Sequence, residues 1–267
     1  MNQGMKVAVR SGGDLGTAII HKLHRSGFRV LVLETDSPLA IRREVAFSEA
    51  VSEGKALVEG IEAQRIDEID DIQKLWEKGI IPVLVDAKAD ILTTLSFDVV
   101  VDAIMEKRKS GTHRKMAPIT IAIGPGFVAG RDVDIVIETN RGHNLGRLIF
   151  EGGAEPDTGS PGDIMGMTDQ RVIRAPKEGV LKAIKKIGDL VKSGEKIAEV
   201  EGVPVITEID GVLRGLIKDG THVPKSLKIA DVDPRGKLEY CYTISEKARN
   251  IAGGVLEAIL LMKNQLN

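Results

Sequence analysis

A dense group of polar side chains follows an apolar run near the middle of the chain. Residues 135–137 are Ile-Val-Ile, and residues 138–147 read Glu-Thr-Asn-Arg-Gly-His-Asn-Leu-Gly-Arg. Guanidinium groups form planar forks for phosphate or carboxylate, amides donate and accept hydrogen bonds, and histidine transfers protons near neutral pH. The pattern predicts an anion-binding loop, and its alternative is a solvated turn with an incidental histidine. The predicted ligands are Asn140, Arg141, Asn144 and Arg147, and the predicted proton-transfer residue is His143.

A glycine-rich turn near the N-terminus is the second group with a definable chemistry. Apolar residues 6–9 precede residues 11–17, which read Ser-Gly-Gly-Asp-Leu-Gly-Thr, and a helical pattern follows. A strand, a glycine turn and a helix in this order present backbone N–H groups to a phosphate. The dinucleotide template G-x-G-x-x-G is matched at Gly13 and Gly16 but begins with Ser11, so the match is partial. The residues expected to bind the phosphate are Ser11, Gly12, Gly13, Gly16 and Thr17.

Acidic residues near this turn help to distinguish a nucleotide-binding turn from a purely structural one. A second strand, predicted over 29–33, is followed by Glu34 and Asp36, which lie 18 and 20 residues after Gly16. In dinucleotide-binding units, the acidic residue that accepts a hydrogen bond from the ribose hydroxyl lies at about this sequence spacing from the glycine turn. Glu34 is therefore the predicted ribose ligand. Asp14 opposes an anion unless it caps the helix. Nucleotide binding and a turn with a purely structural role are the two alternatives.

Further strands continue the α/β pattern. They are predicted near 56–58, 81–85 and 99–101, with an amphipathic helix over 67–78 between two of them. Asp86 and Asp102 follow the last two of these strands and either line the same crevice or serve as turn formers and helix caps.

A glycine loop and three closely spaced apolar segments complete the N-terminal half. Residues 119–123 lead into Gly-Pro-Gly-Phe, and Gly124 and Gly126 are expected to let the backbone wrap a ligand. The apolar segments 119–123, 134–137 and 147–150 are joined by connections too short for crossover helices. An antiparallel extension of the sheet is therefore predicted.

An internal repeat occupies the C-terminal part. Gly-Val-Leu at 179–181 and Lys-Ile-Ala-x-Val at 196–200 return at an offset of 32 as 211–213 and 228–232. Two copies of a short β unit predict a pseudo-symmetric barrel-sandwich, similar to biotinyl and lipoyl carrier domains. The connecting hairpin, 200–204, reads Val-Glu-Gly-Val-Pro and contains no lysine. We therefore expect no lipoyl or biotinyl modification, and a structural or partner-docking role for this domain.

The amino-acid composition disfavours nucleic acids and membranes as partners. A formal net charge of -2, a pI near 6.3 and 3% aromatic residues disfavour nucleic acid as the partner, because phosphate binding needs a concentrated basic face. The chain has neither the apolar core of a signal peptide nor a run of ~20 apolar residues, so a cytoplasmic protein without a membrane partner is expected. Its one cysteine, Cys241, excludes an internal disulfide and is predicted to be a half-buried strand residue.

These observations predict an α/β fold class with three parts. Residues 1–170 are expected to form a Rossmann-like α/β domain with an antiparallel extension, and residues 171–235 a barrel-sandwich β domain. Residues 236–267 are expected to form a strand and a helix that pack back on the core, since Gly253 and Gly254 inside the helical pattern favour close packing.

Six segments together resemble one family across nearly the whole chain. They are residues 11–17, 124–127, 138–147, 155–159, 231–235 and 245–257. The family is the YqeB-like accessory proteins of the selenium-dependent molybdenum hydroxylase system, which is distantly similar to the Rossmann-like xanthine dehydrogenase accessory factors. The resemblance implies maturation or delivery of a molybdopterin-type cofactor, with an apo-hydroxylase as partner. Where family members carry a first glycine in the turn, this chain has Ser11.

The residues themselves leave other functions open. An NAD-dependent small-molecule oxidoreductase would use Glu34 for ribose and His143 to polarise a carbonyl, and a non-catalytic scaffold would use only the barrel-sandwich for docking. Whether the chain is an enzyme, which metal it needs and how it oligomerises are not predicted.

Overall fold

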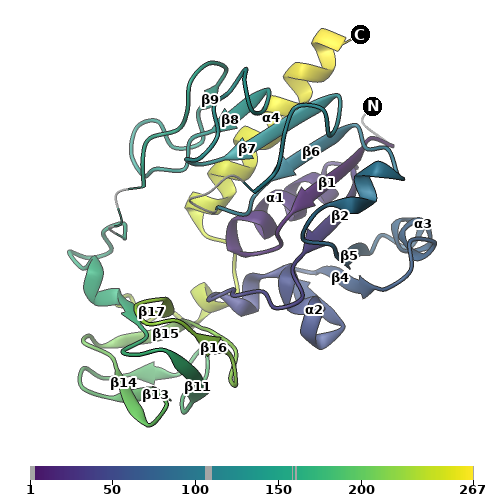
Figure 1. Ribbon diagram of the computed structural model, residues 1–267. Helices are drawn as coiled ribbons and strands as arrows, with labels where there is room; N and C mark the ends of the chain where they lie inside the picture. The colour runs from purple at the N-terminus through teal and green to yellow at the C-terminus, as the bar shows by residue number, and fades with distance from the viewer. Residues whose placement is uncertain (1–3, 106–109, 158, 160, 267) are drawn as a thin grey trace. The chain divides into compact units, whose positions relative to one another are not determined.

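The chain divides into two compact units. A computed structural model describes residues 4–105, 110–157, 159 and 161–266. The larger unit comprises Met1–Pro38, Ala46–Asp157 and Ile244–Asn267, and the smaller comprises Leu39–Val45 and Thr158–Thr243. Figure 1 shows the strands and helices of both.

A nine-stranded mixed sheet forms the larger unit, in the order β3-β4-β5-β2-β1-β6-β7-β8-β9. The six pairings from β4 to β8 are parallel, and the edge pairs β3–β4 and β8–β9 are antiparallel. Most strands from β2 to β8 are nearly continuous buried apolar runs, as expected for parallel strands covered on both faces. The strands are β1 (Lys6–Arg10), β2 (Arg29–Glu34), β3 (Lys55–Val58), β4 (Ile61–Ile66), β5 (Ile81–Val85), β6 (Val99–Asp102), β7 (Ile119–Ile123), β8 (Ile135–Ile137) and β9 (Leu148–Ile149).

Two long helices, α1 (Asp14–Arg25) and α4 (Glu246–Leu266), lie side by side in this unit, and α4 also packs on β7 and β8 (Figure 1). The helices are α1 (Asp14–Arg25), α2 (Ala50–Glu53), α3 (Asp71–Glu77) and α4 (Glu246–Leu266), with short 3-10 helices η2 (Phe47–Glu49) and η3 (Asp90–Thr93). The predicted close packing of the double glycine is confirmed at Gly254. A Cβ there would lie 2.4 Å from the carbonyl oxygen of Gly146, whereas one on Gly253 would meet only the Lys22 ammonium at 3.8 Å.

Gly254→Ala is expected to lower the free energy of unfolding by about 2 kcal/mol, because the backbone of Gly146 has to move away from the new methyl group. The neighbouring variant Gly253→Ala is the matched control, and it is expected to gain up to about 1 kcal/mol from helix propensity alone. Urea unfolding of both variants measures the difference. Equal stability of the two variants would contradict the close contact.

The Rossmann-like fold class predicted for residues 1–170 is wrong. The sheet is mixed, with an antiparallel strand at each edge, and the β3–β4 hairpin at one edge was not predicted. The predicted antiparallel extension is also wrong in part, because β7 and β8 pair in parallel and only β9 runs antiparallel. The loop over residues 124–134 connects the parallel strands β7 and β8 without a helix. The prediction assumed that a connection this short would join antiparallel strands.

Two four-stranded antiparallel sheets form the smaller unit, in the orders β10-β17-β15-β12 and β14-β13-β11-β16. The strands are β10 (Val172–Arg174), β11 (Gly179–Ala183), β12 (Leu190–Val191), β13 (Lys196–Val200), β14 (Val203–Ile206), β15 (Gly211–Leu216), β16 (His222–Val223) and β17 (Lys228–Asp233). Short 3-10 helices are η1 (Arg43–Val45), η4 (Asp169–Arg171) and η5 (Leu238–Cys241).

The sequence repeat is confirmed as a repeat of strands, since β11, β12 and β13 recur as β15, β16 and β17 at the offset of 32. The two copies exchange their short strands: β16 pairs with β11, and β12 pairs with β15. Buried residues of both copies, such as Leu181 and Leu213, share one core. Neither copy therefore completes its sheet without the other.

The predicted biotinyl-like barrel is wrong as a fold class, because this unit consists of two separate antiparallel sheets. The strand expected after residue 235 is the 3-10 helix η5, where Cys241 is fully buried rather than half-buried. Burial raises the pKa of its thiol. An N-terminal segment also belongs to this unit, since Leu216 N donates to Ile41 O (2.8 Å) and Arg42 Nη2 to Tyr240 O (2.9 Å).

Candidate functional site

The glycine turn after β1 is shaped mainly by contacts with its own chain. Ser11 takes the left-handed conformation, with φ of 82°, and its N–H donates to Leu33 O at 2.8 Å. A Cβ on Gly16 would lie 2.1 Å from Ser11 O, and one on Gly12 would lie 2.9 Å from Ser48 N. Gly12 and Gly16 are therefore required by packing, whether or not a ligand binds.

Two more of the predicted ligands have intramolecular partners. The Thr17 hydroxyl donates to Gly12 O (2.7 Å) and accepts from Phe47 N (2.9 Å). Glu34 is 5% exposed, and its two oxygens accept from the N–H groups of Gly12 (2.7 Å) and Thr35 (2.8 Å). The carboxylate therefore stabilises the turn, and this geometry gives no support to its predicted role as a ribose ligand.

Gly13 faces open space at the start of α1. A Cβ there would meet only Ser11 Oγ, at 3.6 Å. No described side chain caps the helix, and the first intrahelical bond runs from Thr17 N to Gly13 O. The N–H groups of the first helical turn consequently lack helical acceptors and carry the positive end of the helix dipole.

The loop after β8 is closed at its base by a buried carboxylate. Glu138 is 2% exposed, and its Oε1 accepts from the N–H groups of Thr139 and Asn140, both at 2.7 Å. Its Oε2 accepts from Glu155 N at 2.8 Å. The Glu138 backbone also pairs with Arg147 and Gly146. Glu138 thus determines the loop conformation that the polar cluster needs.

The predicted side chains of this loop do not all converge on one point. Arg141 pairs with Glu246 at 2.7 Å, and Arg147 Nη1 donates to Asn144 Oδ1 at 3.3 Å. Asn140 Nδ2 donates to Glu155 Oε2 at 2.5 Å. His143 is exposed, and within the described residues its imidazole has no hydrogen-bond or ion-pair partner. Each arginine therefore has a neighbour that partly satisfies it before any ligand arrives.

The second glycine turn lies against the start of this loop. Gly124 has φ of 70°, its N–H donates to Ile137 O (2.8 Å), and a Cβ there would lie 2.8 Å from Thr139 Oγ1. Gly126, with φ of 115°, is exposed. The ends of β7 and β8 are thereby held together.

Lys247 connects the glycine turn with the polar loop, and the sequence pattern did not identify it. Burial and the charge of Arg141 lower the pKa of its ammonium, against the opposing effect of the carboxylates of Asp14, Asp157 and Glu138. Its half-buried side chain therefore lies within electrostatic reach of both the α1 N-terminus and the loop. The available signal was its position: a lysine in the first turn of a helix is disfavoured by the helix dipole, which suggests another role.

The acids predicted at the strand ends have structural roles. Asp102 is 2% exposed and lies 3.6 Å from Arg10 Nη1, and the Thr112 hydroxyl donates to it at 2.5 Å. Asp86 accepts the N–H groups of Asp90 and Ile91, both at 2.9 Å, and so caps η3. Within the described ranges, no group of three or more histidine, cysteine, aspartate or glutamate side chains is placed to hold a metal ion. The helices described are also too short or too polar to cross a membrane.

The solved structures similar to this chain include two distant likenesses. The aspartoacylase family protein mlr6093 from Mesorhizobium loti is 9% identical, with 87% of this chain and 86% of that chain covered and a TM-score of 0.26. The ectoine utilization protein EutE (DoeB) from Ruegeria pomeroyi, in its product-bound structure, is 12% identical, with 86% and 85% covered and a TM-score of 0.27. TM-scores at this level do not establish a shared fold. No family model matches the chain.

Comparison with curated sequences returns a much stronger relationship. "Uncharacterized protein YqeB" from Escherichia coli (strain K12) is 46% identical over 259 residues. The alignment covers 97% of this chain and 48% of that protein, so the chain spans about half the length of the curated relative it matches. This similarity supports the assignment of the chain to a YqeB-like family.

Proposed function

We propose that the chain is an accessory factor for maturation of a selenium-dependent molybdenum hydroxylase. In this proposal it holds a small anionic cofactor, of the molybdopterin type or bearing a nucleotide, and delivers it to the apo-hydroxylase. The cofactor binds at the carboxyl edge of the parallel strands, where ligands collect in open α/β sheets. The family resemblance of the sequence motifs supports this role, and the 46% identity to the uncharacterized protein YqeB supports the family itself.

The observation that carries the proposal is the open first turn of α1 within electrostatic reach of Lys247. Backbone N–H groups without helical acceptors and an adjacent ammonium are suited to a phosphate group. The orientation of the turn itself is fixed by Glu34 and Ser48, so the donors are held in place before the ligand arrives. Arg141 adds a second positive charge near Lys247, against the carboxylates of Asp14, Asp157 and Glu138.

The same charges predict how a phosphate would affect protonation. Burial and Arg141 both disfavour the charged form of Lys247, which lowers its pKa. A bound anion opposes both effects and raises the pKa again, so binding is accompanied by proton uptake wherever Lys247 is partly deprotonated when free. This linkage distinguishes binding beside Lys247 from binding elsewhere on the protein.

Lys247→Gln is expected to weaken the binding of a phosphopterin at least tenfold, because a charge-assisted bond contributes about 1.5 to 3 kcal/mol. The variant is also expected to abolish the proton uptake. Calorimetric titration in two buffers of different ionisation enthalpy measures both quantities. Lys78→Gln, an exposed lysine after α3, is the matched control and should bind as the parent does. Unchanged affinity in Lys247→Gln would refute this site.

A reconstitution assay with the apo-hydroxylase tests the delivery step. In the proposal His143 transfers a proton rather than holding charge, so His143→Ala should retain phosphopterin affinity while hydroxylase activation falls. Arg141→Ala and Arg147→Ala should instead lose affinity, and less so at high salt. Full activation by all three variants would identify the loop as a solvated turn.

A further inference from the structure

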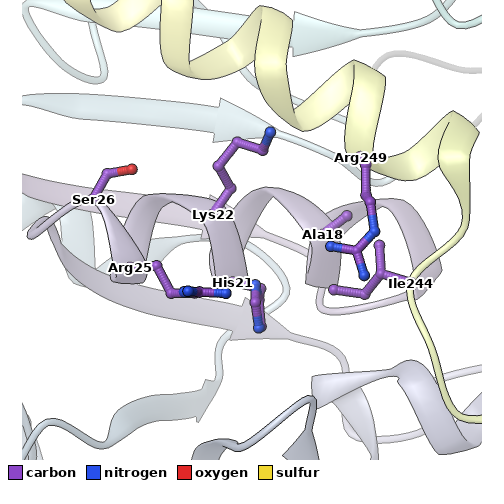
Figure 2. A pocket seen from close by; sticks show the side chains of 7 residues that line it. All are labelled: Ala18, His21, Lys22, Arg25, Ser26, Ile244 and Arg249. Carbon is purple, nitrogen blue, oxygen red and sulfur yellow. The ribbon is translucent and has the colours of Figure 1, made fainter.

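A pocket of about 220 Å³ opens in the larger unit, beside α1 and the start of α4. Most of its polar lining is basic: His21, Lys22 and Arg25 come from α1, and Arg249 comes from α4. Figure 2 shows His21 and Arg25 on the same side of α1, as their spacing of four residues requires, with Arg249 reaching in beside Ile244. Nothing in the proposed function uses this pocket.

His21 is the buried polar group of the pocket. It is 3% exposed, and among the described residues its Nε2 atom has no hydrogen-bond partner. The nearest carboxylate oxygen, Glu59 Oε2, is 4.0 Å away, which is too long for a hydrogen bond. Burial lowers the pKa of the imidazole, Glu59 opposes this, and Arg25 and Arg249 add to it. A buried polar atom without a partner is costly, so its presence beside a cavity points to a ligand.

The charge around His21 is not balanced. Arg249 Nη2 donates to Glu59 Oε1 at 2.5 Å, and the same oxygen accepts from Ile244 N at 2.8 Å. Lys22 and Arg25 have no hydrogen-bond or ion-pair partner in the described part of the chain. The helix dipole accounts for basic residues near the C-terminus of α1, but it does not account for the buried imidazole. Arg25 and Arg249 thus act on His21 against one carboxylate, Glu59, while Lys22 extends from α1 toward α4 (Figure 2).

We propose that this pocket binds a small oxyanion of the phosphate class. Guanidinium and ammonium groups neutralise its charge, and hydrogen phosphate carries both acceptor oxygens and a donor hydroxyl. It can therefore satisfy His21 Nε2 in either tautomer of the ring. The α1 residues that line the pocket run from Ala18 to Arg25, about 6 to 16 Å along the helix from Asp14, and the pocket shares no lining residue with the glycine turn, so it is a second site.

Titration with inorganic phosphate at constant ionic strength tests this site. Arg25→Gln and Lys22→Gln are each expected to weaken binding at least tenfold, because each removes a charge-assisted bond from a small ligand. Lys78→Gln is the matched control for Lys22→Gln and should bind inorganic phosphate as the parent does. Lys247→Gln reports on phosphate bound at the sheet edge, so a loss seen in Arg25→Gln but not in Lys247→Gln belongs to this pocket. The imidazole nitrogen signals of His21 should shift on addition of phosphate.

A parallel titration with glycerol phosphate identifies the source of the anion. Tighter binding of the ester assigns the pocket to the phosphate group of a larger molecule, and tighter binding of inorganic phosphate assigns it to the free ion. Arg25 is exposed and Lys22 is half-buried, so both variants should fold, which thermal unfolding checks. The proposal is overturned if the parent shows no saturable binding, or if Arg25→Gln and Lys22→Gln both bind as tightly as Lys78→Gln.

Discussion

Gly16→Ala is expected to lower the stability of the larger unit by more than about 3 kcal/mol. The new Cβ would lie 2.1 Å from Ser11 O and 3.0 Å from Ser11 C, which are backbone atoms. Ser11 cannot easily withdraw, because its N–H is bonded to Leu33 O and its φ of 82° is already strained for a serine. Urea unfolding followed by the fluorescence of Trp76, the single tryptophan of the chain, measures the loss in this unit.

Gly13→Ala provides the control within the same turn. Its φ of -66° and ψ of -172° suit any residue, and a Cβ there meets only Ser11 Oγ at 3.6 Å. We expect a change within about 1 kcal/mol, the usual range for a helix cap. If Gly16→Ala proved as stable as Gly13→Ala, the close approach of helix and turn would be disproved. The two glycines of the partial dinucleotide template therefore have different roles, one in packing and one at an open surface.

Much of the local structure was predictable because buried parallel strands are continuous apolar runs. The predicted strands at 81–85 and 119–123 are confirmed residue for residue. The order of strand, turn and helix at the N-terminus is also confirmed, although the strand runs one residue further, to Arg10, and the helix already begins at Asp14. Strand β4 was missed because its sequence, Ile-Glu-Ala-Gln-Arg-Ile, contains three polar residues and lacks the continuous apolar run of the central parallel strands. The fold class was mispredicted because the direction of β3, β8 and β9 depends on which strand each pairs with, and local sequence does not encode this pairing.

For the candidate site too, the sequence predicted the local groups but not the tertiary contacts between them. The composition of residues 138–147 identified the polar loop, but not that Arg141 pairs with Glu246, 105 residues away. Lys247 could not be connected with the glycine turn before the packing of α4 was known. The need for a glycine at position 146 also depends on the packing of α4, since a Cβ there would lie 3.3 Å from the carbonyl oxygen of Asn250. Sequence patterns thus identify the groups, whereas helix packing determines which of them meet.

The motif at 231–235, one of the segments that carry the family resemblance, forms a buried charge network in the smaller unit. Asp231 accepts from Arg171 Nη1 (3.0 Å) and Arg214 Nε (2.8 Å). Asp233 accepts from Arg214 Nη1 (3.0 Å) and Arg235 Nη2 (2.6 Å), and it is fully buried. Both carboxylates lie on β17, and Arg214 on β15 bridges them. The motif is therefore explained by the stability of this sheet, without any ligand.

Asp233→Asn is expected to destabilise the smaller unit by about 3 kcal/mol or more at pH 7, because it leaves buried arginine charge uncompensated. The two tyrosines of the chain, Tyr240 and Tyr242, both lie in this unit, so near-ultraviolet circular dichroism follows its unfolding in urea. Asp169→Asn, at an exposed aspartate of the same unit, is the matched control and should change stability by less than about 0.5 kcal/mol.

The pH dependence of the stability difference between the parent and Asp233→Asn provides the sharper test. Burial opposes ionisation of Asp233, but hydrogen bonds from Arg235 and the charge of Arg214 outweigh it and lower the pKa of the carboxyl. Its stabilising contribution is therefore complete above the unfolded-state pKa of about 3.9 and is lost as the pH falls through the lower folded-state pKa. The gap between parent and Asp233→Asn should be constant from pH 7 to about pH 5 and should narrow below about pH 4. A gap that stays constant through the acid range would show that Asp233 stabilises β17 by shape rather than by charge.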